Sequence, residues 1–93
     1  MIVGTVEIDL YLPGINSLKE KRRRLKSLLA KMQNKYNVSI AEVALNDTLR
    51  SARLGAAVVS NDHKFVDRMI SRIVGIVDSH PEVNMTDYRV EIL

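Results

Sequence analysis

A run of basic side chains between positions 19 and 35 is the part of the sequence best suited to chemistry. The segment holds eight Lys or Arg residues and a single Glu, a net charge of +7, and the rest of the chain carries −4 of the total +3. Lys and Arg neutralise phosphates and release counterions, so the segment predicts binding to structured RNA, the ribosome in particular. A solvated helix surface is the alternative interpretation. The expected phosphate contacts are Lys19, Arg23, Arg24, Lys26 and Lys31.

A turn-like stretch at residues 46–51 supplies a second candidate contact. Asn46-Asp47-Thr48 has the composition of a tight turn, and Leu49 and Arg50 follow it. If this hairpin loop lies near the start of the basic helix, we expect Leu49 and Arg50 to touch the same partner.

Arg22 is interpreted differently from its basic neighbours. At 100° per residue it lies about 40° from the centre of the apolar stripe of its helix. Its stem is therefore expected to pack on apolar surface, with the guanidinium paired to Asp9 or Glu42. Anion binding is the alternative role for this residue.

Two carboxylates on the first predicted strand, Glu7 and Asp9, lie about 7 Å apart on one face. That spacing would suit a general acid and base. Cross-strand salt bridges to Arg89 and Arg53 are the favoured interpretation, because opposite charges commonly pair between strands.

No catalytic, cofactor or metal site is predicted. His63 and His80 are separated by about 25 Å of helix at 1.5 Å per residue, which is too far for one metal ion. Asn61-Asp62-His63 is interpreted as a helix cap, because Asn and Asp are ordinary capping residues. The chain contains neither a phosphate loop nor a nucleophile elbow. We therefore expect a protein that is not an enzyme.

Six periodic segments must position these residues within one domain, residues 1–93. Apolar residues alternate along residues 2–12, and Ser17-Leu18-Lys19-Glu20 is a capping box that starts a helix at about Leu18. The order β-α-β-β-α-β predicts an α+β, ferredoxin-like fold, with a four-stranded antiparallel sheet and two helices on one face. The remaining expected segments are a strand at 38–45 with a possible bulge at Glu42, a strand at 53–60, a helix from about 63 to His80-Pro81, and a strand at 83–93.

The same alternation predicts which side chains are buried and which lie on the open face of the sheet. That face lacks the aromatic platform of RNA-recognition motifs, so RNA binding through the sheet is disfavoured. Apolar residues among its charges favour a homodimer, through the open face or through an exposed strand edge. The predicted core is Val6, Ile8, Leu10, Leu25, Leu29, Met32, Val58, Phe65, Met69, Ile73 and Val90.

Composition favours a cytoplasmic protein. The chain has no cysteine, its first nine residues include Glu7 and Asp9 where a signal peptide needs apolar residues, and no apolar run approaches the ~20 residues of a membrane helix. We expect no membrane contact.

Three stretches resemble the YlxP-like bacterial family, a domain of unknown function (503): Ser17 to Leu28, Asn37 to Val43 and Leu54 to Asp62. The resemblance implies a ferredoxin-like fold and a translation-associated role, because such proteins are often encoded beside translation-initiation and ribosome-maturation genes. It implies no catalytic residues. Family members tend to have a tryptophan in the hairpin where this chain has Leu49, so any contact there is expected to be weaker or different in this protein.

A second resemblance gives an alternative function. The stretch Asp9 to Ile15, with its Pro13-Gly14 turn, is similar to the strand-to-helix turn of ACT domains. Those ferredoxin-like modules bind amino acids between subunits, so the alternative is a dimeric small-molecule binding module.

Overall fold

The computed structural model describes residues 1–93, and its secondary structure follows the predicted order. Alternating apolar residues form the strands, and the two periodic segments between capping residues form the helices. The elements are β1 (Ile2–Tyr11), α1 (Leu18–Lys35), β2 (Ser39–Ala44), β3 (Ser51–Ser60), α2 (His63–Ser79) and β4 (Asn84–Ile92).

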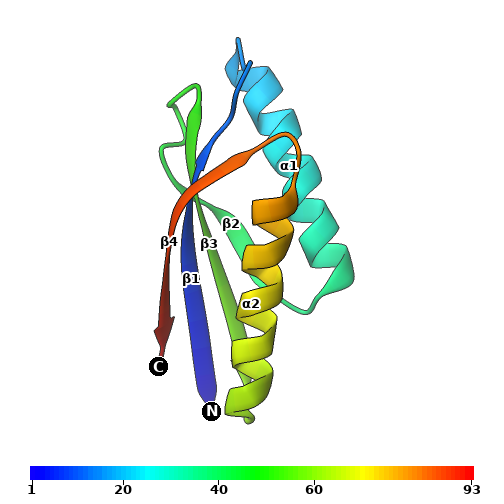
Figure 1. The fold of residues 1–93 in the computed structure, drawn as a ribbon, viewed down its shortest axis with the longest axis vertical. Helices are drawn as coiled ribbons and strands as arrows, with labels where there is room; N and C mark the ends of the chain where they lie inside the picture. Colours follow the sequence, from blue (N-terminus) through cyan, green and yellow to red (C-terminus); the bar gives the residue numbers. More distant parts are fainter.

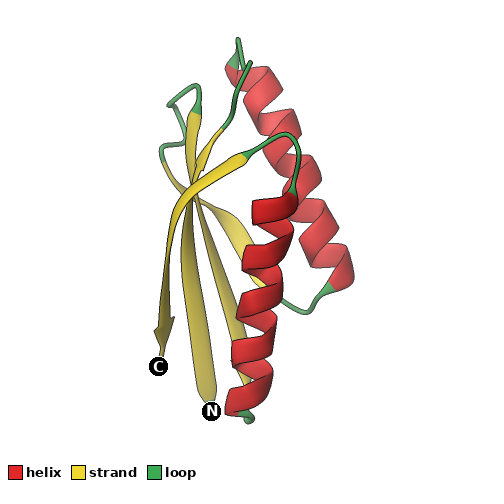
Figure 2. Cartoon of the chain, viewed as in Figure 1, coloured by secondary structure: helices red, strands yellow, loops and turns green.

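The four strands make one sheet in the order β2-β3-β1-β4, and every neighbouring pair is antiparallel. Both helices cover the same face of this sheet, and the other face is open (Figures 1 and 2). The predicted arrangement of four strands and two helices is therefore confirmed. β2 and β4 are the edge strands.

Side chains close the first turn of each helix as the sequence predicts. Ser17 Oγ accepts a hydrogen bond from the Glu20 amide at 3.1 Å, and Glu20 Oε2 accepts one from the Asn16 amide at 3.2 Å. At α2, Asp62 Oδ1 accepts from the Lys64 amide at 3.0 Å. The interpretation of Asn61-Asp62-His63 as a cap is confirmed, since these bonds satisfy amides that the helix leaves unpaired.

The core lies between the helices and the inner face of the sheet, and it contains 19 buried hydrophobic residues. Three predicted core residues differ: Leu29 and Phe65 are half-buried at its margin, and Val90 is 46% exposed. The prediction that Val90 is buried was wrong, because β4 is an edge strand and α2 lies mainly over β1 and β3. Those confirmed as buried are Val6, Ile8, Leu10, Leu25, Met32, Val58, Met69 and Ile73.

Two irregularities bend the sheet. The register of β2 on β3 shifts between Glu42 and Ala44, so the predicted bulge is confirmed. A second shift, which the sequence did not predict, interrupts the pairing of β1 with β4 between Asp9 and Leu10.

Candidate nucleic-acid interface

Four cations stand together on the outer surface of the first turns of α1: Lys19, Arg22, Arg23 and Lys26. Lys19, Arg23 and Lys26 fall on the side of the helix away from Leu28 and Met32, which face the core. Arg22 lies at the flank, where it and Lys26 line a shallow groove with Leu25 and Glu42. All four are exposed, and none forms an ion pair. We call these four residues the basic face.

Arg24 and Lys31, the other two predicted contacts, lie outside the basic face. Arg24 is half-buried, and its Nη1 donates to the carbonyl oxygens of Pro13 at 2.7 Å and Glu82 at 3.1 Å. Its Nε also lies 3.2 Å from Glu82 Oε2, so an acid already neutralises this guanidinium. Lys31 is exposed and unpaired, two turns further along the helix.

The ion pair predicted for Arg22 was wrong. Arg22 is exposed, and both carboxylates proposed as its partners bind other cations: Asp9 pairs with Arg53, and Glu42 pairs with Lys21. Sequence analysis therefore left Arg22 out of the basic face and assigned its packing role to the wrong residue.

Lys21 is the cation that packs into the protein. It is completely buried, and three oxygen atoms surround its Nζ: the Leu45 carbonyl at 2.7 Å, the Thr48 carbonyl at 2.6 Å and Glu42 Oε2 at 3.0 Å. The ammonium donates hydrogen bonds to the two carbonyls, and its contact with the Glu42 carboxylate is an ion pair. Glu42 Oε2 is buried and has no other partner. The spacing of Lys21 to Leu25, Leu28 and Met32 was the signal for this burial, because it continues the apolar stripe.

The contacts of Lys21 bring the β2–β3 hairpin to the start of α1. Arg50 is exposed and unpaired, and its carbonyl accepts from the Leu12 amide at 2.9 Å. Leu49 is half-buried against the core. The hairpin and the N-terminal end of α1 lie at the same end of the molecule, the upper end in Figure 1. The hairpin loop therefore lies near the start of the basic helix, which is the arrangement in which Leu49 and Arg50 are predicted to touch the same partner.

On the open face of the sheet, Asp9 lies between two arginines. Arg53 Nε is 2.7 Å from Asp9 Oδ1, and Arg89 Nη1 is 3.2 Å from Oδ2; Glu7 is 3.9 Å from Arg89. These hydrogen bonds, from Arg53 first and then Arg89, lower the pKa of Asp9 from 3.8 to about 2. The predicted cross-strand salt bridges are confirmed, and a carboxylate held ionised in this way is a poor general base.

The remaining candidate sites carry no chemistry that we can assign. His63 pairs with Asp67 at 3.1 Å, and no group of three or more His, Cys, Asp or Glu side chains is close enough to hold a metal ion. The Pro13-Gly14 turn, where Gly14 has φ of 75°, lines none of the cavities at the surface. Neither α1 nor α2 combines the length and the hydrophobicity that a membrane-spanning helix needs.

The element order β-α-β-β-α-β and the strand order β2-β3-β1-β4 define a small ferredoxin-like α+β domain. The structure is similar to the de novo designed protein Foldit4, with a TM-score of 0.57 and 15% identity, covering 99% of this chain and 94% of that chain. It is similar to an Arabidopsis thaliana protein, with a TM-score of 0.53 and 12% identity over 98% and 92% of the chains. A designed protein with a ferredoxin fold gives a TM-score of 0.50 and 17% identity over 100% and 84%. These similarities show the fold alone.

Residues 3–90 match the family described as "Protein of unknown function (DUF503)". The chain is also 37% identical over 90 residues to "Uncharacterized protein YlxP" of Bacillus subtilis (strain 168), covering 97% of this chain and 98% of that protein. The chain belongs to the DUF503 family, and the resemblance predicted from its sequence is confirmed. The family's description gives no role for its members.

Proposed function

We propose that this protein is a non-enzymatic RNA-binding module that associates with the ribosome through the basic face of α1. The observation that carries the proposal is the absence of any ion pair at Lys19, Arg22, Arg23 and Lys26, although six contacts between Lys or Arg and a carboxylate form elsewhere in the chain. Exposed cations without acidic partners are free to exchange their counterions for phosphates.

The proposal accounts for a protein without a base-reading surface. Phosphate contacts fix position on a nucleic acid and carry little sequence information. Because the groove of a folded RNA is recognised mainly by its shape, a short row of cations suits structured RNA better than one defined sequence. Lys31 and Arg50, both exposed and unpaired, would extend the row at its margins.

Ribosome co-sedimentation with charge-reversed variants tests this function. We expect R23E/K26E to lose most of its association at low salt. The matched control is K64E/R68E, which makes the same change in net charge on two exposed, unpaired residues of α2 at the opposite end of the helical layer (Figure 1). Retained binding by R23E/K26E, or equal loss in both variants, would contradict a specific role for the basic face.

Amino-acid binding between ACT-like subunits remains the alternative function. Its support is the resemblance of residues 9–15 to the ACT turn; in this structure the Pro13 carbonyl accepts a hydrogen bond from Arg24 at 2.7 Å, and the turn lines no cavity. A rise in melting temperature on adding individual amino acids, together with no RNA association, would favour this alternative.

The proposed module is a homodimer. Val43 and Val59 leave apolar side chains exposed on the open face of the sheet. Tyr88 and Val90 do the same on the edge strand β4. Covering such side chains stabilises an association in proportion to the apolar area removed from water. Light scattering at tens of micromolar measures the mass directly, and a monomer would contradict this part of the proposal.

A further inference from the structure

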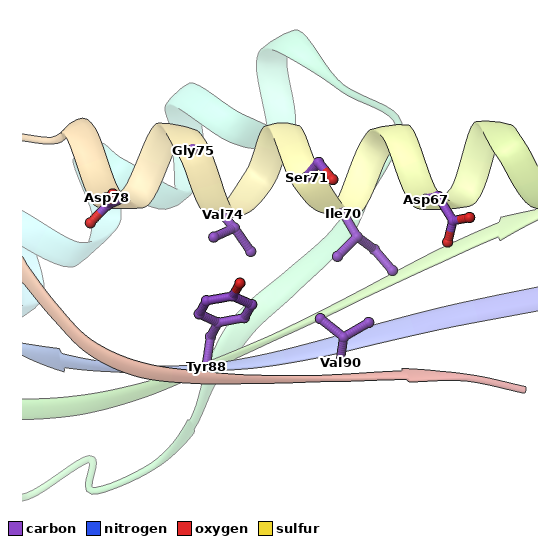
Figure 3. A pocket seen from close by; sticks show the side chains of 8 residues that line it. All are labelled: Asp67, Ile70, Ser71, Val74, Gly75, Asp78, Tyr88 and Val90. Atoms are coloured by element: carbon purple, nitrogen blue, oxygen red, sulfur yellow. The ribbon is translucent and has the colours of Figure 1, made fainter.

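The edge of β4 combines a free strand with uncovered apolar side chains. β4 is a terminal strand of the sheet, and Tyr88 and Val90 are 47% and 46% exposed on its helix-facing side. Figure 3 shows both side chains below Ile70 and Val74 of α2, in a groove of about 460 Å³ between that helix and β4. Since α2 covers only one side of them, the row along β4 is open toward the edge.

The backbone of this edge has hydrogen-bonding capacity at alternate residues. Val3 and Leu93 exchange two backbone hydrogen bonds, of 3.3 and 2.7 Å. In an antiparallel ladder such pairs recur at every second residue, so the odd-numbered residues of β4 bond to β1. The amide and carbonyl groups of Tyr88, Val90 and Ile92 therefore point outward from the sheet. In the single chain the outward amide of Tyr88 is met by its neighbour's side chain, Asp87 Oδ1, at 2.8 Å.

We infer that a second copy of this chain adds its β4 antiparallel along this edge, with the two-fold axis passing through Val90. The inference rests on the proposed homodimer and selects its geometry. Val90 then exchanges two backbone hydrogen bonds with the partner's Val90, and Tyr88 lies opposite the partner's Ile92. The exposed apolar rows of the two strands cover each other on the helix-facing side.

Charge selects this register from its neighbours. Hydrogen bonds between the two copies can form only between their outward-pointing, even-numbered residues. The two-fold axis must therefore pass through a residue of β4 and not between two residues. An axis at Arg89 would place two arginines face to face, and one at Glu91 would do the same with two glutamates. Like charges directly opposite are destabilising. The axis at Val90 places Arg89 opposite the partner's Glu91, and it does so twice.

An axis at Tyr88 also gives opposite charges but fits less well. It would place Arg89 opposite the partner's Asp87, and these two residue types already pair within one chain at 3.3 Å. It would also carry the pairing across the part of β4 where the register on β1 shifts. Glu91, in contrast, has no ion pair in the single chain, so only the Val90 axis supplies a missing partner.

Cross-linking tests the register, because the chain contains no cysteine. Residues of a hydrogen-bonded antiparallel pair have Cα atoms about 5.5 Å apart, a separation that a disulfide spans. Under mild oxidation V90C is expected to form a disulfide-linked dimer in high yield. Y88C, at an equally exposed position, is expected to give several-fold less. More dimer from Y88C than from V90C would overturn the register.

Two lysine substitutions test the interface itself. V90K places two like charges at the axis and is expected to give a monomer by light scattering, with an unchanged circular dichroism spectrum. V59K is the control, since Val59 is 58% exposed on the open face of the sheet, and it is expected to remain dimeric. A dimer that V59K dissociates and V90K does not would overturn this geometry while leaving the homodimer standing. A wild-type monomer would overturn both.

Discussion

Lys21 links the β2–β3 hairpin to α1 through its ammonium group. This ammonium is the only buried charge of α1. The ammonium lies within 3.0 Å of a carboxylate oxygen and of two carbonyl oxygens from the hairpin. Removing one partner of a buried ion pair leaves the other charge without compensation, which is far more destabilising than losing an exposed pair. Lys21 is thus a structural residue, although it lies within the basic segment 19–35 of the sequence.

Replacing Lys21 tests this structural role. K21M should lower the free energy of unfolding by about 3–5 kcal/mol, because Glu42 Oε2 and two carbonyls lose their partner. K26M, the same substitution at an exposed position, should change it by less than about 0.5 kcal/mol. Urea denaturation measures both, and equal stabilities for the two variants would contradict the assignment.

Asp9 makes stability depend on pH in a defined window. Its pKa of about 2 in the folded protein lies below the 3.8 of an ordinary aspartate, so the unfolded chain binds the proton more tightly. The stabilisation is present above about pH 4 and is lost as the pH falls towards 2. Because Asp9 is partly exposed, we expect a contribution of about 1–2 kcal/mol rather than the full linkage value.

Urea unfolding of D9N at pH 6 and at pH 2.5 measures this contribution. The difference between wild type and D9N should be largest at pH 6 and should shrink at pH 2.5. D47N, at an exposed aspartate without an ion pair, should follow wild type at both values. A difference that grows on acidification would show that the sign of the linkage is wrong.

The packing of α2 on β1 depends on a glycine. A Cβ built at Gly4 would lie 2.3 Å from Val66 Cγ1 and 2.6 Å from Ile70 Cδ1, both on α2. The branched side chain of Val66 has little rotamer freedom in a helix, so the helix would have to move. Gly75, in the middle of α2, has no heavy atom within 4 Å of such a Cβ.

The same substitution at these two glycines should therefore have opposite effects. G4A should lower the free energy of unfolding by about 1–3 kcal/mol through overpacking. G75A should raise it by about 0.5–1 kcal/mol, because alanine favours a helix interior. Thermal denaturation of the two variants checks the signs, and a stabilising G4A would contradict the close packing of α2 on β1.

Local patterns were sufficient to predict the elements, because alternation and capping depend on neighbours in the sequence. Ser17 and Asp62 cap their helices as expected, and the order of strands and helices is the predicted one. The position of Lys21 on the apolar stripe indicates burial, but its acceptors come from residues 42–48, which only the fold brings to it. The exposure of Val90 likewise depends on where α2 lies across the sheet.

The basic helical face and the β4 edge lie at opposite sides of the sheet. α1 contacts β2 at one edge, and β4 forms the other. In the inferred dimer the two sheets are continuous, so both helical layers lie on the same face and the two basic faces stand at its far ends. One RNA could then contact two sites, which raises the overall affinity beyond that of a single site.

The salt dependence of RNA binding is the most direct test of the central claim. If the four cations of the basic face contact phosphates, the logarithm of the association constant should fall with the logarithm of the salt concentration with a slope of about −3 or steeper. R23E/K26E should weaken binding and make that slope shallower by about 2, roughly one for each lost contact. Filter binding of ribosomal RNA over a series of salt concentrations gives both values. No association of the wild-type protein at low salt, or an unchanged slope in R23E/K26E, would contradict RNA binding by the basic face.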